Sequence, residues 1–177
     1  IRASVPRRKS PFPAYFKGFP VVSPLIPPYP AFLKYPVSPQ HYPLNGSEAE
    51  ILNGIQDMLR DFYYDEVPAK AGAGETLALL QDHGIPMAAA TSSPRGHVTH
   101  ALDRLGLLPY ISTIFTTGEV GRSKHEPDIY HLAAQALHTV PAETLVFEDS
   151  LYALRTAKAA GYRTVGLYDA DGEADQE

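Results

Sequence analysis

The stretch Leu145-Val146-Phe147-Glu148-Asp149-Ser150-Leu151 decides the fold, together with the alanine-rich run that continues to Gly161. Its apolar start predicts a strand, its two adjacent carboxylates a loop, and the amphipathic run a helix. The helix ends at a glycine, the residue that most easily takes the positive φ of a helix end. In open α/β sheets, ligands bind at the carboxyl ends of the strands. Glu148 and Asp149 therefore predict a hard-oxygen site suited to Mg²⁺.

The composition sets broad limits on the class of protein. The chain has 177 residues, which is enough for one domain with a real core or for a small domain with an extension. It contains no Cys, which excludes disulfides, thiolate metal sites and a Cys nucleophile and fits a reducing compartment. No apolar run approaches the length of a membrane span. We expect a cytoplasmic monomer without nucleic-acid or membrane partners.

The N-terminal quarter differs from the rest in charge and in proline content. Residues 1–47 carry six basic residues and no acid, and residues 1–45 hold eleven of the seventeen prolines. Each proline removes a backbone donor and restricts the residue before it, so neither a helix nor a central strand is expected there. We predict a Pro-rich irregular or disordered segment over 1–45. The alternative is an interaction arm, because Pro24-Leu25-Ile26-Pro27 and Pro36-Val37-Ser38-Pro39 fit PxxP.

The composition changes at Gly46. Ser47-Glu48-Ala49-Glu50 is a capping box, and apolar residues at helical spacing follow it to about Asp65. Val67-Pro68 ends this helix, which gives a helical segment over 46–67. From residue 68 to 177, strands alternate with helices, which predicts βαβ units and a parallel sheet. The predicted strands are 85–90, 114–117, 144–147 and 164–168, and the predicted helices are 74–82, 151–160 and two that begin near Pro94 and Pro127.

Two further stretches carry candidate site residues. Thr91 and Ser92 follow a strand and precede a helix, where hydroxyl groups and free helix N–H groups together form an anion site. The alternative is a simple hydroxyl cap on that helix. Lys124 lies just before another helix, and taken alone it reads as a surface lysine. Phosphoryl transfer needs donors and a cation to hold the phosphate oxygens, and a divalent ion to offset charge. Thr91 and Ser92 supply donors, Lys124 supplies the cation, and the two carboxylates after the later strand can bind the ion.

The ordered set resembles the haloacid dehalogenase-like superfamily of phosphohydrolases, in particular its phosphoglycolate phosphatase and β-phosphoglucomutase type. Ala90-Thr91-Ser92-Ser93 resembles the second motif of that family, Ser123-Lys124-His125-Glu126-Pro127-Asp128 the third, and Val146-Phe147-Glu148-Asp149-Ser150 the fourth. The resemblance covers about Gly46 to Tyr168. It implies a Rossmann-like three-layer α/β/α core with a parallel sheet over 68–177, incomplete here, and a cap-derived helix over 46–67.

The resemblance also implies roles for these residues. Thr91 and Ser92 would contact the phosphate, and Lys124 would bridge the nucleophile and the phosphate. Glu148 and Asp149 would hold Mg²⁺. Thr91 and Lys124 are therefore the expected catalytic residues that this chain retains, and a small phosphorylated metabolite is the expected partner.

The first motif of the family is missing where it should lie. It is a buried strand ending in Asp-x-Asp-Gly-Thr, whose first Asp is the nucleophile, and residues 1–45 contain no Asp. The resemblance thus implies a Mg-dependent phosphohydrolase of sugar-phosphate or phosphoglycolate-like substrates, acting through a phosphoaspartyl intermediate but incomplete and inactive in this chain. The alternative is a non-catalytic remnant that binds Mg²⁺ or phosphate, or that acts through its Pro-rich arm.

A second stretch imitates the missing motif. Val165-Gly166-Leu167-Tyr168-Asp169-Ala170-Asp171-Gly172 has the apolar-run-then-D-x-D-G form, which would make Asp169 the nucleophile of a permuted site. It is followed by Glu173 rather than Thr, and D-x-D-G is also ordinary turn chemistry. In the family this strand lies beyond the fourth-motif strand, which disfavours the permuted alternative.

Overall fold

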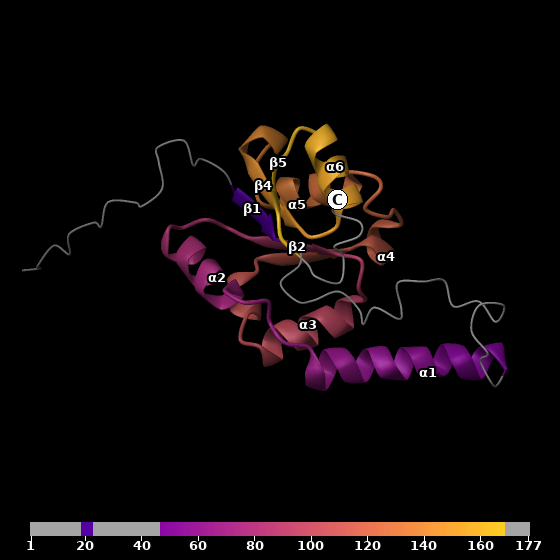
Figure 1. The fold of residues 1–177 in the computed structure, drawn as a ribbon. Helices are drawn as coiled ribbons and strands as arrows, with labels where there is room; N and C mark the ends of the chain where they lie inside the picture. Colours follow the sequence, from indigo (N-terminus) through magenta and orange to yellow (C-terminus); the bar gives the residue numbers. More distant parts are fainter. Residues whose placement is uncertain (1–18, 23–46, 169–177) are drawn as a thin grey trace, which may run out of the picture.

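A single five-stranded sheet organises the molecule (Figure 1). The computed structural model describes residues 19–22 and 47–168. Every neighbouring pair of strands is parallel, in the order β3-β2-β1-β4-β5. The strands are β1 (Phe19–Val22), β2 (Ala88–Thr91), β3 (Thr113–Thr116), β4 (Thr144–Glu148) and β5 (Arg163–Gly166).

Helices cover both faces of the sheet and make a three-layer sandwich. In Figure 1, α2 and α3 lie on one side and α5 and α6 on the other, while α1 lies outside the layers next to α3. This confirms the predicted α/β fold with a parallel sheet. The α-helices are α1 (Glu48–Asp61), α2 (Ala73–Asp82), α3 (Arg95–Arg104), α4 (Thr117–Val120), α5 (Asp128–Ala136) and α6 (Leu151–Ala159). The shorter helical turns are η2 (Phe62–Glu66), η3 (Leu108–Tyr110) and η4 (Pro141–Glu143).

The central strand β1 corrects one sequence prediction. Proline content argued against any central strand within residues 1–45, yet Phe19–Val22 lies between β2 and β4. Pro20 is tolerated because it stands near the start of the strand, where pairing with β2 has not begun: that pairing starts at Val21. Two β-branched valines then follow, which suit a strand. The rest of 1–45, with both PxxP matches, lies outside the described residues.

The alternation of side chains along β2 explains how one strand serves two cores. Met87 and Ala89 face the cluster that contains Leu77 and Leu102, whereas Ala88 and Ala90 face the cluster that contains Ile129. Small alanines on β2 let the helices pack closely against the sheet on both sides. The buried run predicted for this strand is therefore a strand covered on both faces, as parallel sheets require.

Several helix boundaries follow the local chemistry of the sequence. The capping box at Ser47 and Glu50 is present, with the Ser47 backbone N–H donating to Glu50 at 2.8 Å. Gly161 has the positive φ expected at a helix end, 90°. One boundary differs from the sequence pattern: the strand predicted over 114–117 ends at Thr116, and the short helix α4 begins at Thr117. The Thr116 side chain accepts from the Glu119 N–H and caps this short helix.

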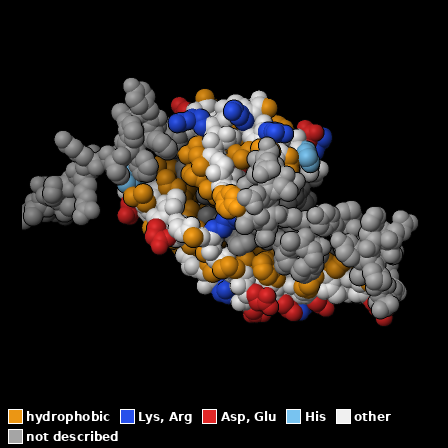
Figure 2. Space-filling model, in the orientation of Figure 1, with side chains coloured by type: hydrophobic (Ala, Val, Ile, Leu, Met, Phe, Trp, Pro, Cys, Tyr) orange, Lys and Arg blue, Asp and Glu red, His pale blue; other side chains and the backbone are white. Residues whose placement is uncertain are grey.

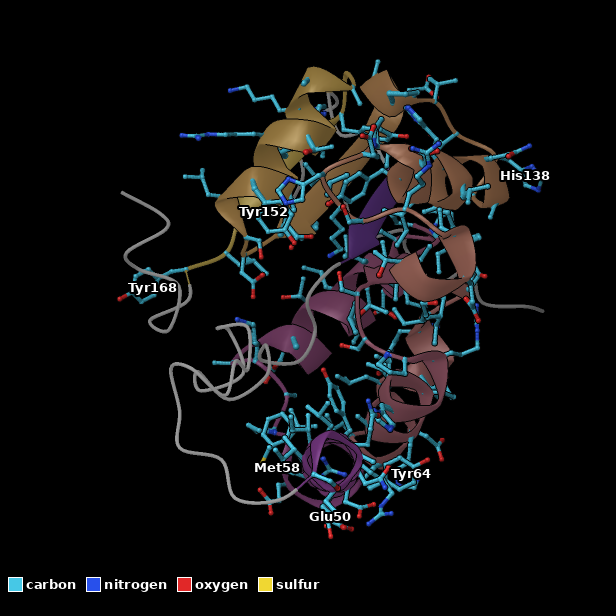
Figure 3. The ribbon with its side chains drawn as sticks, turned by 90° about the vertical axis from the view of Figure 1, so that its right-hand side faces the viewer. Glu50, Met58, Tyr64, His138, Tyr152 and Tyr168 are labelled. Atoms are coloured by element: carbon cyan, nitrogen blue, oxygen red, sulfur yellow. The ribbon has the colours of Figure 1, made fainter. Side chains whose placement is uncertain are left out.

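Aromatic stacking joins η2, the turn that continues α1, to α3. Figure 3 shows α1 almost along its axis, with Met58 and Tyr64 on opposite sides of the helix. Tyr64 stacks on His100 of α3, with ring centroids 3.8 Å apart. Acidic side chains gather near the C-terminal end of α1, whereas Lys and Arg side chains gather over α6 and β5 (Figure 2). The exposed basic residues of that second region include Arg155, Lys158 and Arg163.

The last strand lies at an edge of the sheet. β5 pairs with β4, and Gly166 is level with Glu148. Tyr168 beyond it is 69% exposed and points away from the domain (Figure 3). Asp169, the nucleophile of the permuted alternative, lies outside the described residues. Among the residues that are described, no helix is both long and apolar enough to cross a bilayer.

Candidate active site

Two carboxylates are buried at the carboxyl end of β4. Glu148 is the last residue of the strand and is 2% exposed, and Asp149 in the following loop is 8% exposed. The Leu167 N–H donates to the Glu148 carbonyl at 2.9 Å and holds the end of β4 against the β5 segment. Burying an ionised carboxylate is costly unless a cation or hydrogen bonds compensate it. The surroundings of these two acids therefore decide what the site can do.

Lys124 compensates the charge of Glu148. Its Nζ atom lies 2.8 Å from Glu148 Oε2, and both side chains are more than nine-tenths buried. The fully buried Tyr130 on α5 lies close by, and burial, followed by the negative charge of Glu148, raises the pKa of its hydroxyl. Lys124 is thus a buried member of the cluster and not the solvated surface lysine that its sequence position alone suggests.

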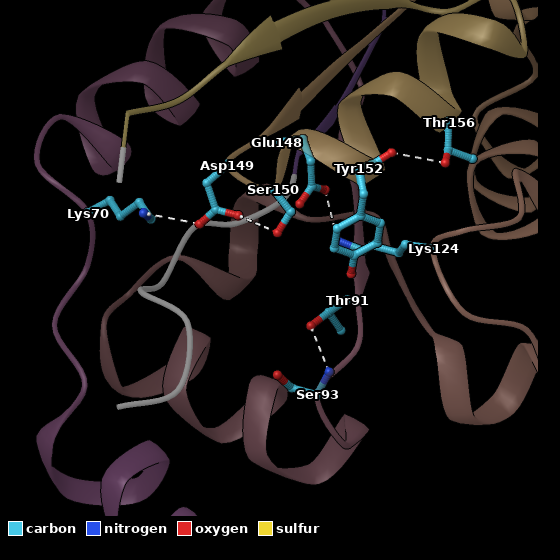
Figure 4. A network of polar contacts seen from close by, with 9 residues as sticks. All are labelled: Lys70, Thr91, Ser93, Lys124, Glu148, Asp149, Ser150, Tyr152 and Thr156. Carbon is cyan, nitrogen blue, oxygen red and sulfur yellow. Dashed lines mark hydrogen bonds and ion pairs between the residues drawn. The ribbon is translucent and has the colours of Figure 1, made fainter. Parts of the chain in front are cut away.

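Lys70 compensates the charge of Asp149, and no sequence motif predicts this contact. Its Nζ atom lies 3.3 Å from Asp149 Oδ2, and the Ser150 hydroxyl lies 3.4 Å from Asp149 Oδ1 (Figure 4). In the sequence Lys70 is part of a short alanine- and glycine-containing connection before α2, which reads as a linker. Only its charge distinguishes it from its neighbours, and no spacing rule relates it to the acidic loop.

Thr91 ends β2 on the same edge of the sheet. Its Oγ1 accepts a hydrogen bond from the Ser93 N–H at 3.1 Å, so it organises the turn that leads into α3. Ser93 is buried, and its hydroxyl is 2.7 Å from the hydroxyl of Tyr63. Ser92 between them is exposed. Pro94 is the N-cap of α3 and offers no side-chain cap to that helix.

The strand register brings these groups together across the end of β1. Val22 is level with Ala89 on β2 and with Phe147 on β4. Glu148 is the next residue of β4 after Phe147, and Thr91 lies two residues after Ala89 on β2. Because β2 and β4 are both neighbours of β1, their ends are about 10 Å apart. Figure 4 shows the hydroxyl and the carboxylate–lysine groups around one region at this edge.

Two rings border the site. His125 and Tyr152 stack with ring centroids 4.3 Å apart, which joins the loop before α5 to the first turn of α6. Burial raises the pKa of the Tyr152 hydroxyl, and the charges of Glu148 and Asp149 add to this effect. The negative charge of the two carboxylates therefore extends to the rim of the site.

The carboxylates fit a magnesium ion as a partial ligand set. Within residues 47–168 and 19–22, no group of three or more His, Cys, Asp and Glu side chains gathers at one point. Mg²⁺ is usually held by only one or two carboxylates, with water and substrate phosphate completing its shell. Glu148 and Asp149 supply those two carboxylates; besides the oxygens nearest the lysines, Asp149 Oδ1 faces the Ser150 hydroxyl.

A family comparison covers most of the chain. A sequence model described as haloacid dehalogenase-like hydrolase matches residues 39–161. The validoxylamine A 7'-phosphate phosphatase of Streptomyces hygroscopicus subsp. limoneus is 37% identical over 109 residues, which is 60% of this chain and 51% of that protein. A phosphoglycolate phosphatase of Escherichia coli is 34% identical over 115 residues, 62% of this chain and 45% of that protein. The chain thus spans about half the length of these relatives.

Solved structures agree with this comparison. A hydrolase of the same family from Deinococcus radiodurans, with bound phosphate and sodium, is 30% identical with a TM-score of 0.62, and the match covers 75% of this chain and 58% of that one. A β-phosphoglucomutase-like protein from Thermotoga maritima, described as putative, is 26% identical with a TM-score of 0.66, and the match covers 77% and 65%.

Proposed function

This chain belongs to the haloacid dehalogenase-like hydrolase family, and on that premise we propose that its sheet edge is the part of a phosphoryl-transfer site that binds magnesium and the phosphate of a small phosphorylated metabolite. A sugar phosphate or a phosphoglycolate-like compound is the proposed substrate class. The observation that carries the proposal is that Thr91 at the end of β2 and Glu148 at the end of β4 lie at one edge of the sheet, where Lys124 from the segment between α4 and α5 pairs with Glu148. The phosphatases among the relatives support the same reaction class.

In this proposal the phosphate lies over the end of β1. The Thr91 hydroxyl and the exposed Ser92 donate hydrogen bonds to its oxygens, and the Lys124 ammonium stabilises their charge from the β4 side. Glu148 holds Lys124 in place through the 2.8 Å contact. These groups orient the phosphate and offset its charge but provide no nucleophile.

Glu148 and Asp149 would hold Mg²⁺ in the same proposal. The ion, when bound, offsets the negative charge of the transferring phosphoryl group. Glu148 ends β4, and Asp149 lies in the short connection between β4 and α6, which begins at Leu151. The chain therefore supplies a pre-arranged pair of carboxylates at low conformational cost.

The covalent step needs an aspartate that β1 does not provide. In the family mechanism a carboxylate oxygen attacks phosphorus, the bond to the leaving alcohol breaks, that alcohol takes up a proton, and water then hydrolyses the acyl phosphate. The central place in the sheet is occupied by Phe19–Val22, and the sequence continues with Ser23. We propose that this chain binds magnesium and phosphate without turnover. Its cytoplasmic location and monomeric state stay predictions.

Calorimetric titration of the full chain with inorganic phosphate, with and without Mg²⁺, tests this function. We expect phosphate to bind in a Mg-dependent way, and Thr91→Val to weaken binding roughly tenfold because one donor to the anion is lost. Thr99→Val on α3 is the matched control and should leave binding unchanged. A generic aryl phosphate should not be turned over. Absence of phosphate binding would contradict the proposal, and turnover abolished by Asp169→Asn would instead support the permuted site.

A further inference from the structure

The contact between Lys70 and Asp149 joins two segments that are far apart in the sequence. Lys70 comes from the connection between η2 and α2, whereas Asp149 lies in the loop after β4. The distance between Nζ and Oδ2 is 3.3 Å, and the side chains are 19% and 7% exposed (Figure 4). An ion pair this shielded is screened far less by solvent than the surface pairs of the same molecule.

The Lys70–Asp149 contact balances charge in the buried cluster. Two buried carboxylates face two ammonium groups, Glu148 with Lys124 and Asp149 with Lys70, so the four side chains together are formally neutral. A buried carboxylate without a cation would be strongly unfavourable. Lys70 therefore stabilises Asp149 in the state of the protein that holds no metal.

A divalent cation on Asp149 would require Lys70 to leave. A metal ion at the carboxylate and an ammonium 3.3 Å from one of its oxygens repel each other strongly in a shielded site. Lys70 can move because its stem is long and flexible and because Ala71 and Gly72, which follow it, are exposed. Gly72 has a φ of 76°, a left-handed conformation that glycine adopts easily.

We infer that Lys70 is an internal counter-ion of Asp149 that competes with the divalent cation for this carboxylate. The inference rests on the proposed function, because it assumes that Asp149 is a metal ligand. Lys70 is then a positioning residue: it keeps the acidic loop in place without metal and lowers the affinity of the site for metal. Lys124 differs because the proposed phosphate, whose negative charge it offsets, favours its place beside Glu148, whereas the proposal puts no anion next to Lys70.

Titration of the full chain with Mn²⁺, followed by the electron paramagnetic resonance signal of free Mn²⁺, tests this competition directly. We expect Lys70→Met and Lys70→Gln to bind Mn²⁺ roughly tenfold more tightly than the unsubstituted chain, because a competing charge is removed. Lys70→Arg keeps the charge and should stay within about twofold. Lys158→Met, at the exposed end of α6, changes the net charge equally and should have no effect beyond that.

Thermal unfolding supplies a second readout that does not depend on activity. With a chelator, Lys70→Met should unfold at a lower temperature than the unsubstituted chain, and saturating Mn²⁺ should raise its midpoint more. A neutral variant that fails to fold even in saturating Mn²⁺ would overturn the inference, because the metal should then replace the lost charge.

The outcomes separate this inference from the proposed function. Equal Mn²⁺ affinity in the unsubstituted chain and in both neutral variants overturns the role of Lys70 and leaves the metal site of the proposed function intact. Absence of Mn²⁺ binding in all of these proteins overturns both. Tighter binding in the neutral variants but not in Lys70→Arg or Lys158→Met supports the competition.

Discussion

The carboxyl ends of β4 and β1 are adjacent in the sheet and differ completely in chemistry. At the end of β4, Glu148 and Asp149 are buried, and each faces a lysine. At the end of β1, the sequence continues as Ser23-Pro24-Leu25, with no acid. The comparison teaches that the parts of such a site are separable, because each is carried by a different strand end. In this sheet, acidic groups lie at the end of β4 while the sequence at the end of the adjacent β1 carries no carboxylate.

The largest effect is expected from removing this difference. Replacing Ser23 and Leu25 by aspartate (S23D with L25D) gives β1 the Asp-x-Asp spacing of the family's first motif. We expect Mg-dependent hydrolysis of an aryl phosphate to appear, on the order of 10³-fold above the unsubstituted chain, because loss of a nucleophile costs enzymes several powers of ten. Phosphate release measured over time checks this.

The matched control for that gain is S23N with L25N, which has nearly the same shape but no carboxylate. It should stay at the background rate. Equal rates in the aspartate and asparagine pairs would mean that the end of β1 does not face the phosphate, and the proposed placement of the substrate would have to be abandoned.

A second effect concerns the β4 side of the comparison. Lys124→Met leaves Glu148 buried without its cation, and we expect a loss of ~3–5 kcal/mol in the free energy of unfolding. Urea denaturation at neutral pH measures it. The double variant with Glu148→Met should recover most of the loss, because both charges are then gone.

An exposed pair is the control for that prediction. Arg60 contacts Asp57 at 2.9 Å with both side chains more than half exposed, so Arg60→Met should change stability barely measurably. If Lys124→Met lowers the free energy of unfolding as little as Arg60→Met does, the buried Lys124–Glu148 pair contributes little to stability.

The smallest effect belongs to an ion pair away from both strand ends. The pKa of Glu119 is lowered from an ordinary value of 4.5 to about 2, and hydrogen bonds from Arg95 are the largest cause. A lowered pKa stabilises the fold fully above pH 4.5, and this contribution is lost as the pH falls from 4.5 toward 2. The thermal midpoint should therefore fall more over this range in the unsubstituted chain than in Glu119→Gln, by less than about 3 °C because the pair is half exposed.

Glu75→Gln, an exposed acid in the first turn of α2, serves as the control and should keep the acid dependence of the unsubstituted chain. Identical acid dependence in Glu119→Gln and Glu75→Gln would count against the Arg95–Glu119 contribution. The contrast with Lys124 would then rest on the buried pair alone.

Much of the fold follows from local patterns. Apolar runs bounded by Gly, Pro and hydroxyl residues predict β2 and β4, and helical spacing predicts α1 and α6. Of the candidate site, the placement of Thr91 and Glu148 at one sheet edge agrees with their motifs. Their roles stay predictions, as does the magnesium site. The sequence pattern does not predict the short helix α4, because its N-cap, Thr116, is also the last residue of β3.

What the sequence determined by itself is the set of strand–loop–helix units and the chemistry at their ends, because hydrophobic period, caps and motif spacing act over a few residues. Only the tertiary structure decided which segment fills the centre of the sheet and which lysine faces which carboxylate. A central strand in a Pro-rich segment depends on the edges that β2 and β4 offer it. The Lys70–Asp149 pair depends on how the chain returns to the sheet after α1, and no local pattern records that path.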